Sequence, residues 1–90
     1  MQELKEAIRE VIEQIKQGYY FDTHTVILML LQKYHDEYLS GFGSHKTTEL
    51  YHAAISNMVK SNSDLVEDIG EAFSKNVHDN FNECHLWRRT

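Results

Sequence analysis

The sequence predicts a small α+β domain in which a core of three helices is followed by a C-terminal β-hairpin. Three observations lead to this prediction. Apolar residues recur at helical spacing in three stretches of the first two thirds of the chain. A cluster of turn-forming residues follows the third stretch, at 61–64. After it, the side chains of residues 84–89 alternate as those of a strand do.

Residues 2–17 are expected to form the first helix. Their apolar side chains recur every three or four positions, which gives one apolar side, and the other side is charged. Gly18 is expected to end the helix, because glycine enters the left-handed conformation without strain. The apolar positions are Leu4, Ala7, Ile8, Val11, Ile12 and Ile15.

A second helix is expected over residues 23–39, after a short aromatic run with β propensity at 19–21. Asp22 is a good N-cap for it. Phe21 and Val26 are spaced as a hydrophobic staple. The apolar arc of this helix is broad, which predicts a central position in the fold. A loop at 40–44, with two glycines, is expected to end it.

The third helix is expected over residues 47–60, and the rest of the chain is organised around it. Its apolar side is predicted to pack on the core. The opposite side carries short polar side chains, namely Thr48, His52, Ser56 and Asn57. The apolar positions are Leu50, Tyr51, Ala54, Ile55, Met58 and Val59.

The segment after the third helix allows two interpretations. The apolar residues of 64–74 fit one side of a helix, which would complete a small all-α bundle. The favoured interpretation pairs a strand at 65–69 with a strand at 84–88, across a loop at 70–83. Five aromatic side chains are expected to fill the core between helices and hairpin: Tyr19, Tyr20, Phe21, Phe73 and Trp87.

Length and composition indicate one domain, 1–90, of an ordinary globular class. The longest apolar run has six residues, at 26–31, far short of the roughly 20 that span a bilayer. The single cysteine, Cys84, excludes an internal disulfide and fits a reducing compartment. We therefore expect a cytoplasmic protein that does not enter the membrane. The net charge of −5 counts against binding to nucleic acid.

The order helix, β-prone run, helix, helix, hairpin resembles the winged helix-turn-helix fold. This resemblance implies that the exposed side of the third helix enters the major groove of DNA and that the hairpin flanks it. It implies a DNA-binding regulator that works as a homodimer. A plain solvated helix face and loop remain the alternative. The implied DNA contacts are Lys46, Thr48, His52, Ser56, Asn57 and Lys60 on or next to the helix, and Lys75, Arg88 and Arg89 on the hairpin.

A second function remains open: an acidic inhibitor or adaptor, of the type that phages and mobile elements encode, which binds a protein and not DNA. In this hypothesis the acidic surface is the working surface, because it steers association with a basic partner. The residues concerned are Glu6, Glu10, Glu13, Glu67, Asp68 and Glu71.

Catalytic and metal-binding motifs are not recognised in the sequence. It has no P-loop, GxSxG, HExxH or Gly-rich dinucleotide turn. The densest group of potential metal ligands lacks the paired spacing of zinc sites, and Cys84 and His85 would point to opposite sides of a strand. We therefore expect neither an enzyme nor a metal or other cofactor. That group consists of His78, Asp79, Glu83, Cys84 and His85.

Overall fold

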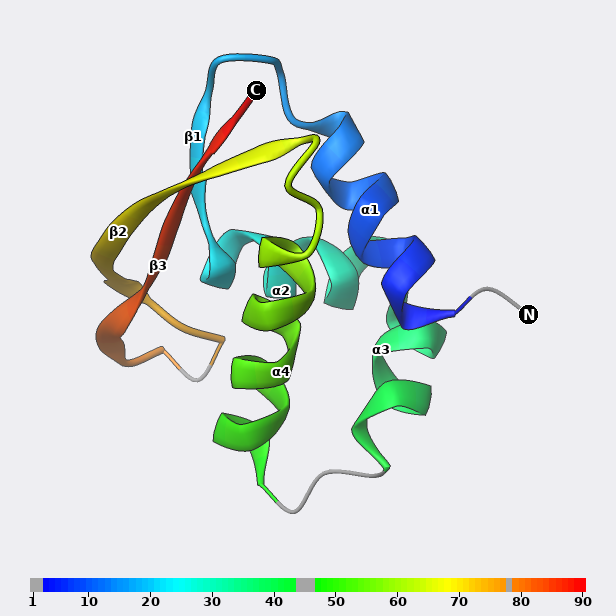
Figure 1. The fold of residues 1–90 in the computed structure, drawn as a ribbon. Helices are drawn as coiled ribbons and strands as arrows, with labels where there is room; N and C mark the ends of the chain where they lie inside the picture. Colours follow the sequence, from blue (N-terminus) through cyan, green and yellow to red (C-terminus); the bar gives the residue numbers. More distant parts are fainter. Residues whose placement is uncertain (1–2, 44–46, 78) are drawn as a thin grey trace.

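The computed structural model describes residues 3–43, 47–77 and 79–90, and in these residues four helices pack against a three-stranded antiparallel sheet (Figure 1). The fold is of the predicted α+β class and is consistent with a winged-helix-like arrangement. The sheet excludes the all-α alternative. In chain order the elements are α1 (Leu4–Gln14), β1 (Tyr20–Asp22), α2 (Thr23–Lys33), α3 (His35–Phe42), α4 (Thr48–Lys60), β2 (Val66–Lys75) and β3 (Phe81–Arg89).

Helix α1 is shorter than predicted. It ends at Gln14, because the backbone of Ile15 is extended (φ −79°, ψ 132°). Gly18 has the positive φ expected of a glycine, +89°, but it lies in the turn before β1 and not in a helix cap. Its N–H donates to the carbonyl of Arg89 over 2.6 Å. A contact with the far end of the chain therefore fixes this turn.

The predicted start of α2 is confirmed. The carboxylate of Asp22 accepts a hydrogen bond from the N–H of Thr25 over 2.8 Å, which is the geometry of an N-cap. Phe21, on β1, and Val26, in the first turns of α2, are both buried in the core. The predicted β-prone run is also confirmed in part, because Tyr20 and Phe21 belong to β1.

The helix predicted over 23–39 is two helices in the structure. Tyr34 interrupts it with φ −132° and ψ 45°, and α3 begins at the next residue. No glycine or proline marks this position, so the local sequence gave no sign of the break. Beyond the break, Tyr38 lies in the core, where its ring centroid is 5.1 Å from that of Tyr51. The break is therefore associated with the packing of Tyr38 on Tyr51 and not with a local sequence signal.

The loop predicted at 40–44 begins later than expected, because α3 continues to Phe42. Gly41 lies inside this helix. A Cβ at this position would come within 2.6 Å of the Tyr51 hydroxyl and 2.7 Å of Cδ2 of Leu4. The glycine therefore permits close packing of α3 against α4 and α1 and does not end the helix. Residues 44–46 lie outside the described part of the chain.

Helix α4 agrees with the prediction to within one residue. Thr47 caps it, since its hydroxyl accepts a hydrogen bond from the N–H of Leu50 over 3.1 Å. The line of fully buried residues is Tyr51, Ile55 and Val59. Leu50 was predicted on the apolar side, but its side chain is 56% exposed because it lies beside this line and not on it.

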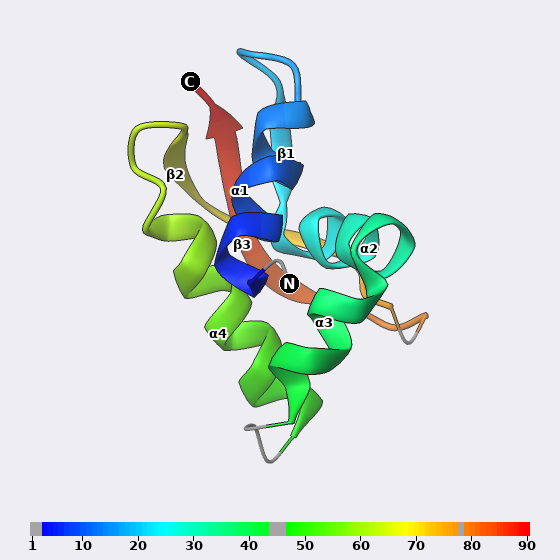
Figure 2. The same ribbon diagram turned by 90° about the vertical axis from the view of Figure 1, so that its right-hand side faces the viewer.

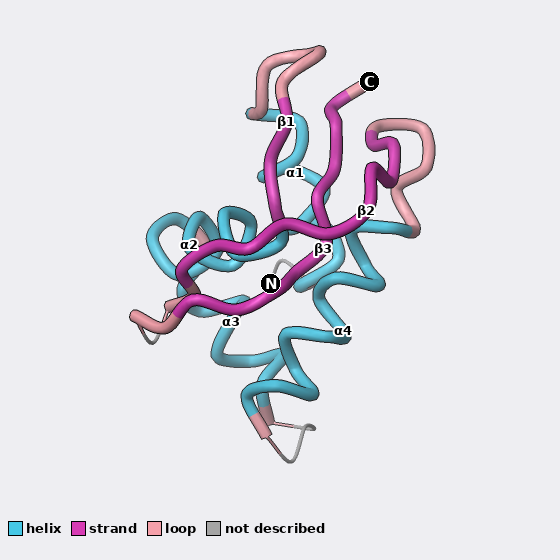
Figure 3. The backbone as a smooth tube through the Cα atoms, turned by 90° about the vertical axis from the view of Figure 1, so that its left-hand side faces the viewer, coloured by secondary structure: helices cyan, strands magenta, loops and turns pink. Residues whose placement is uncertain are grey.

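The predicted hairpin is present, but its strands are longer than predicted. Strand β3 lies between β1 and β2 (Figure 3). The pairing of β2 with β3 runs from Val66 opposite Arg89 to Lys75 opposite Phe81. The predicted loop at 70–83 is therefore wrong in most of its length. Pairing between strands, and not local β propensity, holds residues 70–75 and 81–83 in the ladder.

The core lies between the helices and the sheet. Viewed from the α1 side, α1 lies between α4 on one side and α2 and α3 on the other (Figure 2). Trp87 and Phe21 are buried as predicted. The same prediction is wrong for Tyr19, Tyr20 and Phe73, which are 57%, 62% and 70% exposed. None of the helices in the described residues is both long and apolar enough to cross a membrane.

Candidate functional site

The polar side of α4 is partly turned toward the protein itself. Thr48, His52 and Ser56 are half-buried. The Nε2 atom of His52 lies 2.8 Å from the Tyr38 hydroxyl. The Ser56 hydroxyl lies 3.2 Å from that of Thr23. His52 and Ser56 therefore use hydrogen-bonding capacity within the fold, and they are less free to contact DNA bases than the helical pattern implied.

Two of the predicted helix contacts in the described residues, Asn57 and Lys60, are exposed. The exposed side of α4 also carries Glu49 and Leu50. Lys46 lies outside the described part of the chain, so its prediction cannot be placed on the structure. A helix surface with one carboxylate, one ammonium group and one leucine offers little charge to neutralise phosphates.

Two predicted cations of the hairpin are paired with carboxylates. Lys75 is exposed near the hairpin tip, and its Nζ lies 3.0 Å from a carboxylate oxygen of Asp79. Arg88 is at the other end of β3 and donates to Glu67 over 2.9 Å. Their positive charges are therefore partly neutralised, and the two residues lie at opposite ends of the hairpin.

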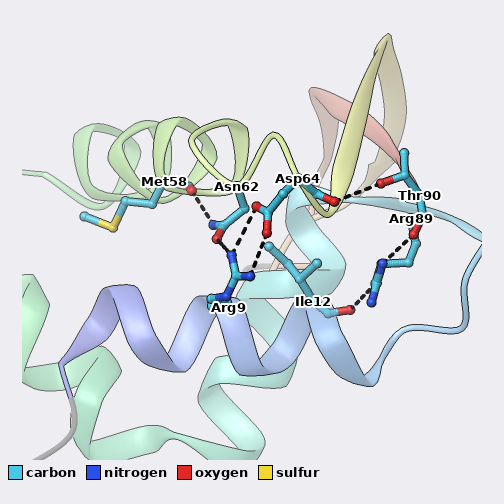
Figure 4. A network of polar contacts seen from close by, with 7 residues as sticks. All are labelled: Arg9, Ile12, Met58, Asn62, Asp64, Arg89 and Thr90. Atoms are coloured by element: carbon cyan, nitrogen blue, oxygen red, sulfur yellow. Dashed lines mark hydrogen bonds and ion pairs between the residues drawn. The ribbon is translucent and has the colours of Figure 1, made fainter.

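Arg89 anchors β3 to α1 (Figure 4). Its Nε donates to the carbonyl of Ile12 over 3.2 Å. Close by, Arg9 of α1 donates two hydrogen bonds to Asp64, over 2.7 and 3.2 Å, and one to Asn62 over 2.9 Å. The hydrogen bond from Arg9 holds the pKa of Asp64 below its ordinary value. The contacts of Arg9 join α1 to the turn after α4. The separate hydrogen bond from Arg89 to Ile12 joins β3 to α1, so Arg89 has a structural role within the fold.

The acidic residues proposed for protein binding fall into two groups. Those of α1 are exposed, and α1 lies on the opposite side of the molecule from the hairpin tip (Figure 1). Those of β2 are also exposed, with Glu67 paired to Arg88 and Asp68 lying 3.7 Å from His85. The first group is Glu6, Glu10 and Glu13, and the second is Glu67, Asp68 and Glu71.

The outer part of the hairpin exposes a pair of stacked phenylalanines. The rings of Phe73 and Phe81 have centroids 5.6 Å apart and planes 24° apart. Direct cross-strand partners share one side of a ladder, and on this side every residue near the tip is exposed. We call this surface the hairpin strip; it consists of Glu71, Phe73 and Lys75 of β2, and Phe81, Glu83 and His85 of β3.

The hairpin strip was not predicted from the sequence, in which Phe73 was expected in the core and Phe81 in a loop. The alternation of Glu71, Phe73 and Lys75 was the available signal, because alternate residues of a strand share one side. That signal became usable only once residues 70–75 were known to be a strand.

A cavity of about 320 Å³ lies between α4, the first turns of α2 and the hairpin. The partly buried polar side of α4 forms one wall, through Thr48, His52 and Ser56. Two carboxylates, Glu49 and Glu83, also line it. Since Glu83 belongs to the hairpin strip as well, the cavity and the strip adjoin. The cavity is large enough for an amino-acid side chain, and its two carboxylates would favour a cationic group.

No protein-family model matches this chain, and neither a curated protein nor a solved structure matches it. The resemblance to winged helix-turn-helix proteins therefore rests on the order and arrangement of the elements. A fold of this kind does not by itself determine a function. The function has to be argued from the surfaces and side-chain clusters of the chain.

Three potential metal ligands from three different elements come together beside this cavity. They are Asp22 of β1, His24 of α2 and Cys84 of β3, and one donor atom of each lies within 4.8 Å of the other two. All three residues are half-buried. Burial raises the pKa of Asp22, but hydrogen bonds from Thr25 and Ser74 lower it more, so its pKa is below its ordinary value. This cluster is not visible in the sequence, because Cys84 is far from Asp22 and His24 in the chain.

Proposed function

We propose that this protein is a small interaction module, an adaptor or inhibitor, which binds a basic partner protein through the hairpin strip. The observation that carries the proposal is the stacked pair Phe73 and Phe81, whose side chains are 70% and 59% exposed. Burial of apolar rings from water favours association. Aromatic side chains are also enriched at the centres of protein interfaces.

The charges around the two rings indicate the chemistry of the partner. In the described residues, Glu71 and Glu83 have no cation within salt-bridge distance. The hairpin as a whole, residues 66–89, has five carboxylates and three cations from Lys or Arg. Because Lys75 and Arg88 are paired with carboxylates, the field at the strip is negative. Such a surface attracts a segment rich in Lys or Arg that also presents an apolar side chain.

The compartment belongs to the same proposal. We place the protein in the cytoplasm, because Cys84 is a free cysteine and a reducing compartment keeps it so.

Affinity capture with matched bait variants tests the proposal. The wild-type chain, Phe73→Ser and Phe81→Ser are immobilised and exposed to extract of the source cells. The control bait is Leu39→Ser, which removes a 54% exposed apolar side chain from α3, away from the hairpin. We expect one basic protein to be captured by the wild type and the control, and to be lost or strongly reduced with both phenylalanine variants.

The captured partner is then purified and its association rate is measured at two salt concentrations. Charge reversal by Glu71→Lys or Glu83→Lys should slow association at low salt more than at high salt, because salt screens the steering field. Charge reversal at Glu67, which is paired with Arg88 within the fold, should have a smaller effect. Capture that is equal for all four baits, or an association rate independent of these charges, contradicts the proposal.

DNA binding is the second candidate, and one observation favours it. Helix α4 presents Asn57 and Lys60 to solvent beside a hairpin, as the winged helix-turn-helix resemblance requires. Asparagine can pair with adenine, and lysine can contact phosphate. If DNA is the ligand, Asn57→Ala should weaken binding to one sequence, and Lys60→Ala should weaken binding to every sequence. Homodimer formation is part of this candidate.

Fluorescence anisotropy of a labelled random duplex separates the two candidates. For DNA binding, the logarithm of affinity should fall with the logarithm of salt concentration by about 0.9 per phosphate contacted. Phe73→Ser should leave such binding unchanged, whereas Lys60→Ala should reduce it. Absence of binding at low salt excludes a non-specific DNA mode and leaves the hairpin strip as the working surface.

A further inference from the structure

The cluster beside the cavity is distinct from the hairpin strip in position and in chemistry. Asp22 and His24 lie at the junction of β1 and α2, and Cys84 lies on the side of β3 that the strip does not use. The cross-strand partner of Cys84 is Ala72, and the next residue on that side of β2 is Ser74. Residues 72, 74 and 84 are all half-buried.

The side chains of the cluster converge on one point, which the hydroxyl of Ser74 marks. Its Oγ lies 2.6 Å from Nδ1 of His24 and 3.7 Å from Sγ of Cys84. One oxygen, one nitrogen and one sulfur donor thus surround a position that is already polar.

We propose that Asp22, His24 and Cys84 bind a divalent transition metal of the zinc class. Carboxylate oxygen, imidazole nitrogen and thiolate sulfur are the three donor types that zinc accepts in proteins. The ion lies between the three donors once the Ser74 hydroxyl has turned away from its position against His24 and Cys84, and either that hydroxyl or a water molecule supplies the fourth ligand of a tetrahedral site.

The start of α2 already positions two of the three ligands, Asp22 and His24. One carboxylate oxygen of Asp22, Oδ1, caps α2 by accepting from the N–H and the hydroxyl of Thr25, each over 2.8 Å. The other oxygen, Oδ2, can therefore coordinate an ion while the cap stays intact. His24 follows in the first turn of the same helix. The three donor atoms lie within 4.8 Å of one another, so bringing them to the spacing of a metal site requires movements of roughly 1 Å at most, within the range of side-chain rotation.

Metal binding would join the hairpin to α2. Asp22 and His24 belong to the part of the chain that packs on the core, whereas Cys84 belongs to the hairpin. An ion bound by all three residues crosslinks these two parts. It also stabilises the fold, because it binds the folded chain and not the unfolded one. The proposal is independent of partner binding at the strip.

Cobalt(II) titration of the full-length, tag-free protein tests the site. The protein is treated with chelator, desalted and kept reduced, and Co²⁺ is followed by its thiolate charge-transfer and visible d–d absorption. We expect one Co²⁺ per monomer with tetrahedral d–d bands, and displacement by Zn²⁺. Cys84→Ser should remove the charge-transfer band. Asp22→Asn and His24→Ala should each weaken binding by about tenfold or more, since even outer-shell changes cost roughly that much.

The variants are chosen to separate ligand loss from unfolding. Asn is as good an N-cap as Asp, so Asp22→Asn keeps the helix start while it removes the carboxylate. His35→Ala is the matched control, because His35 is exposed at the start of α3 and should leave Co²⁺ affinity unchanged. Circular dichroism and the melting temperature of each variant are recorded, and Zn²⁺ should raise the melting temperature of the wild type and of His35→Ala.

Two results would overturn the proposal. One is the absence of a thiolate charge-transfer band in the reduced wild-type protein at stoichiometric Co²⁺. The other is a band that Asp22→Asn and His24→Ala leave unchanged in folded protein, because the thiol would then bind cobalt without these two partners.

Discussion

The indole N–H of Trp87 donates a 3.1 Å hydrogen bond to the hydroxyl of Thr23, which lies 64 residues earlier in the chain. The same hydroxyl is 3.2 Å from that of Ser56. One threonine therefore joins β3, α2 and α4. Trp87 and Thr23 are only 1% and 3% exposed, so water cannot replace the hydrogen bond. The contact holds the sheet on the helices and so fixes the position of the hairpin.

Thr23→Val tests this contact. The substitution keeps the side-chain shape but leaves the buried indole N–H without its acceptor, which should lower the free energy of unfolding by about 1–3 kcal/mol. Urea denaturation followed by Trp87 fluorescence measures the change. The comparison variant is Thr25→Val in the same helix, which loses the hydrogen bond from its hydroxyl to Asp22 at an exposed position where water can replace it, so we expect a smaller loss, about 1 kcal/mol or less. Equal effects of the two substitutions would show that the buried hydrogen bond contributes little.

Gly41→Ala should destabilise the protein by about 1–3 kcal/mol, because the added methyl group overlaps the Tyr51 hydroxyl and Leu4. Gly43→Ala is the control two residues later. Gly43 has right-handed helical angles (φ −59°, ψ −20°), and the nearest atom to an added Cβ is 4.0 Å away. This control should be neutral or stabilising by up to about 1 kcal/mol, since alanine restricts the unfolded chain. Urea midpoints of the two variants should therefore shift in opposite directions or differ clearly in size.

The stability of the protein should fall in alkaline solution as pH rises above about 10. Burial, with a smaller contribution from Tyr38, raises the pKa of Tyr51 to about 12. The unfolded chain therefore loses the Tyr51 proton at lower pH than the folded chain, and the stabilisation present below pH 10 is lost between the two pKa values. Urea denaturation across this range measures the loss.

Tyr51→Phe should reduce that alkaline loss, because phenylalanine has no proton to release. It also removes the 2.7 Å hydrogen bond from the Tyr51 hydroxyl to the carbonyl of Tyr38, which should cost about 0.5–1.5 kcal/mol at neutral pH. Tyr19→Phe, at a 57% exposed side chain, serves as the control and should leave the pH dependence unchanged. An alkaline loss that is the same in Tyr51→Phe and in the wild type would contradict the role of Tyr51.

Predictions of local structure succeeded where the responsible contacts are close in sequence. The apolar spacing of α1 and α4 repeats with each helical turn, so it is visible in a short window. The cap formed by Asp22 on α2 depends on a hydrogen bond to Thr25, three residues away. The hairpin was predicted from alternation in 84–89, although the extent of its strands was not.

Predictions failed where a distant residue decides the outcome. The glycine at 41 predicts a loop, but its contacts with Tyr51 and Leu4 determine its role. Phe73 has a large apolar side chain typical of a core residue, yet the register of β2 with β3 places it on the exposed side of the ladder. Both errors have one cause. A glycine can end a helix or permit close packing, and a phenylalanine can be buried or exposed, and only distant contacts decide between these roles.

The sequence by itself determined the α+β fold class of this protein, the start of α2, the extent of α4 and the presence of a C-terminal hairpin. Only the tertiary structure decided the break at Tyr34, the exposure of the phenylalanine pair and the meeting of Asp22 and His24 with Cys84. Helical periodicity and capping are fixed by hydrogen bonds within a few residues. The side of a long hairpin that is exposed, and the residues that meet across it, depend on strand register and on packing of the whole chain.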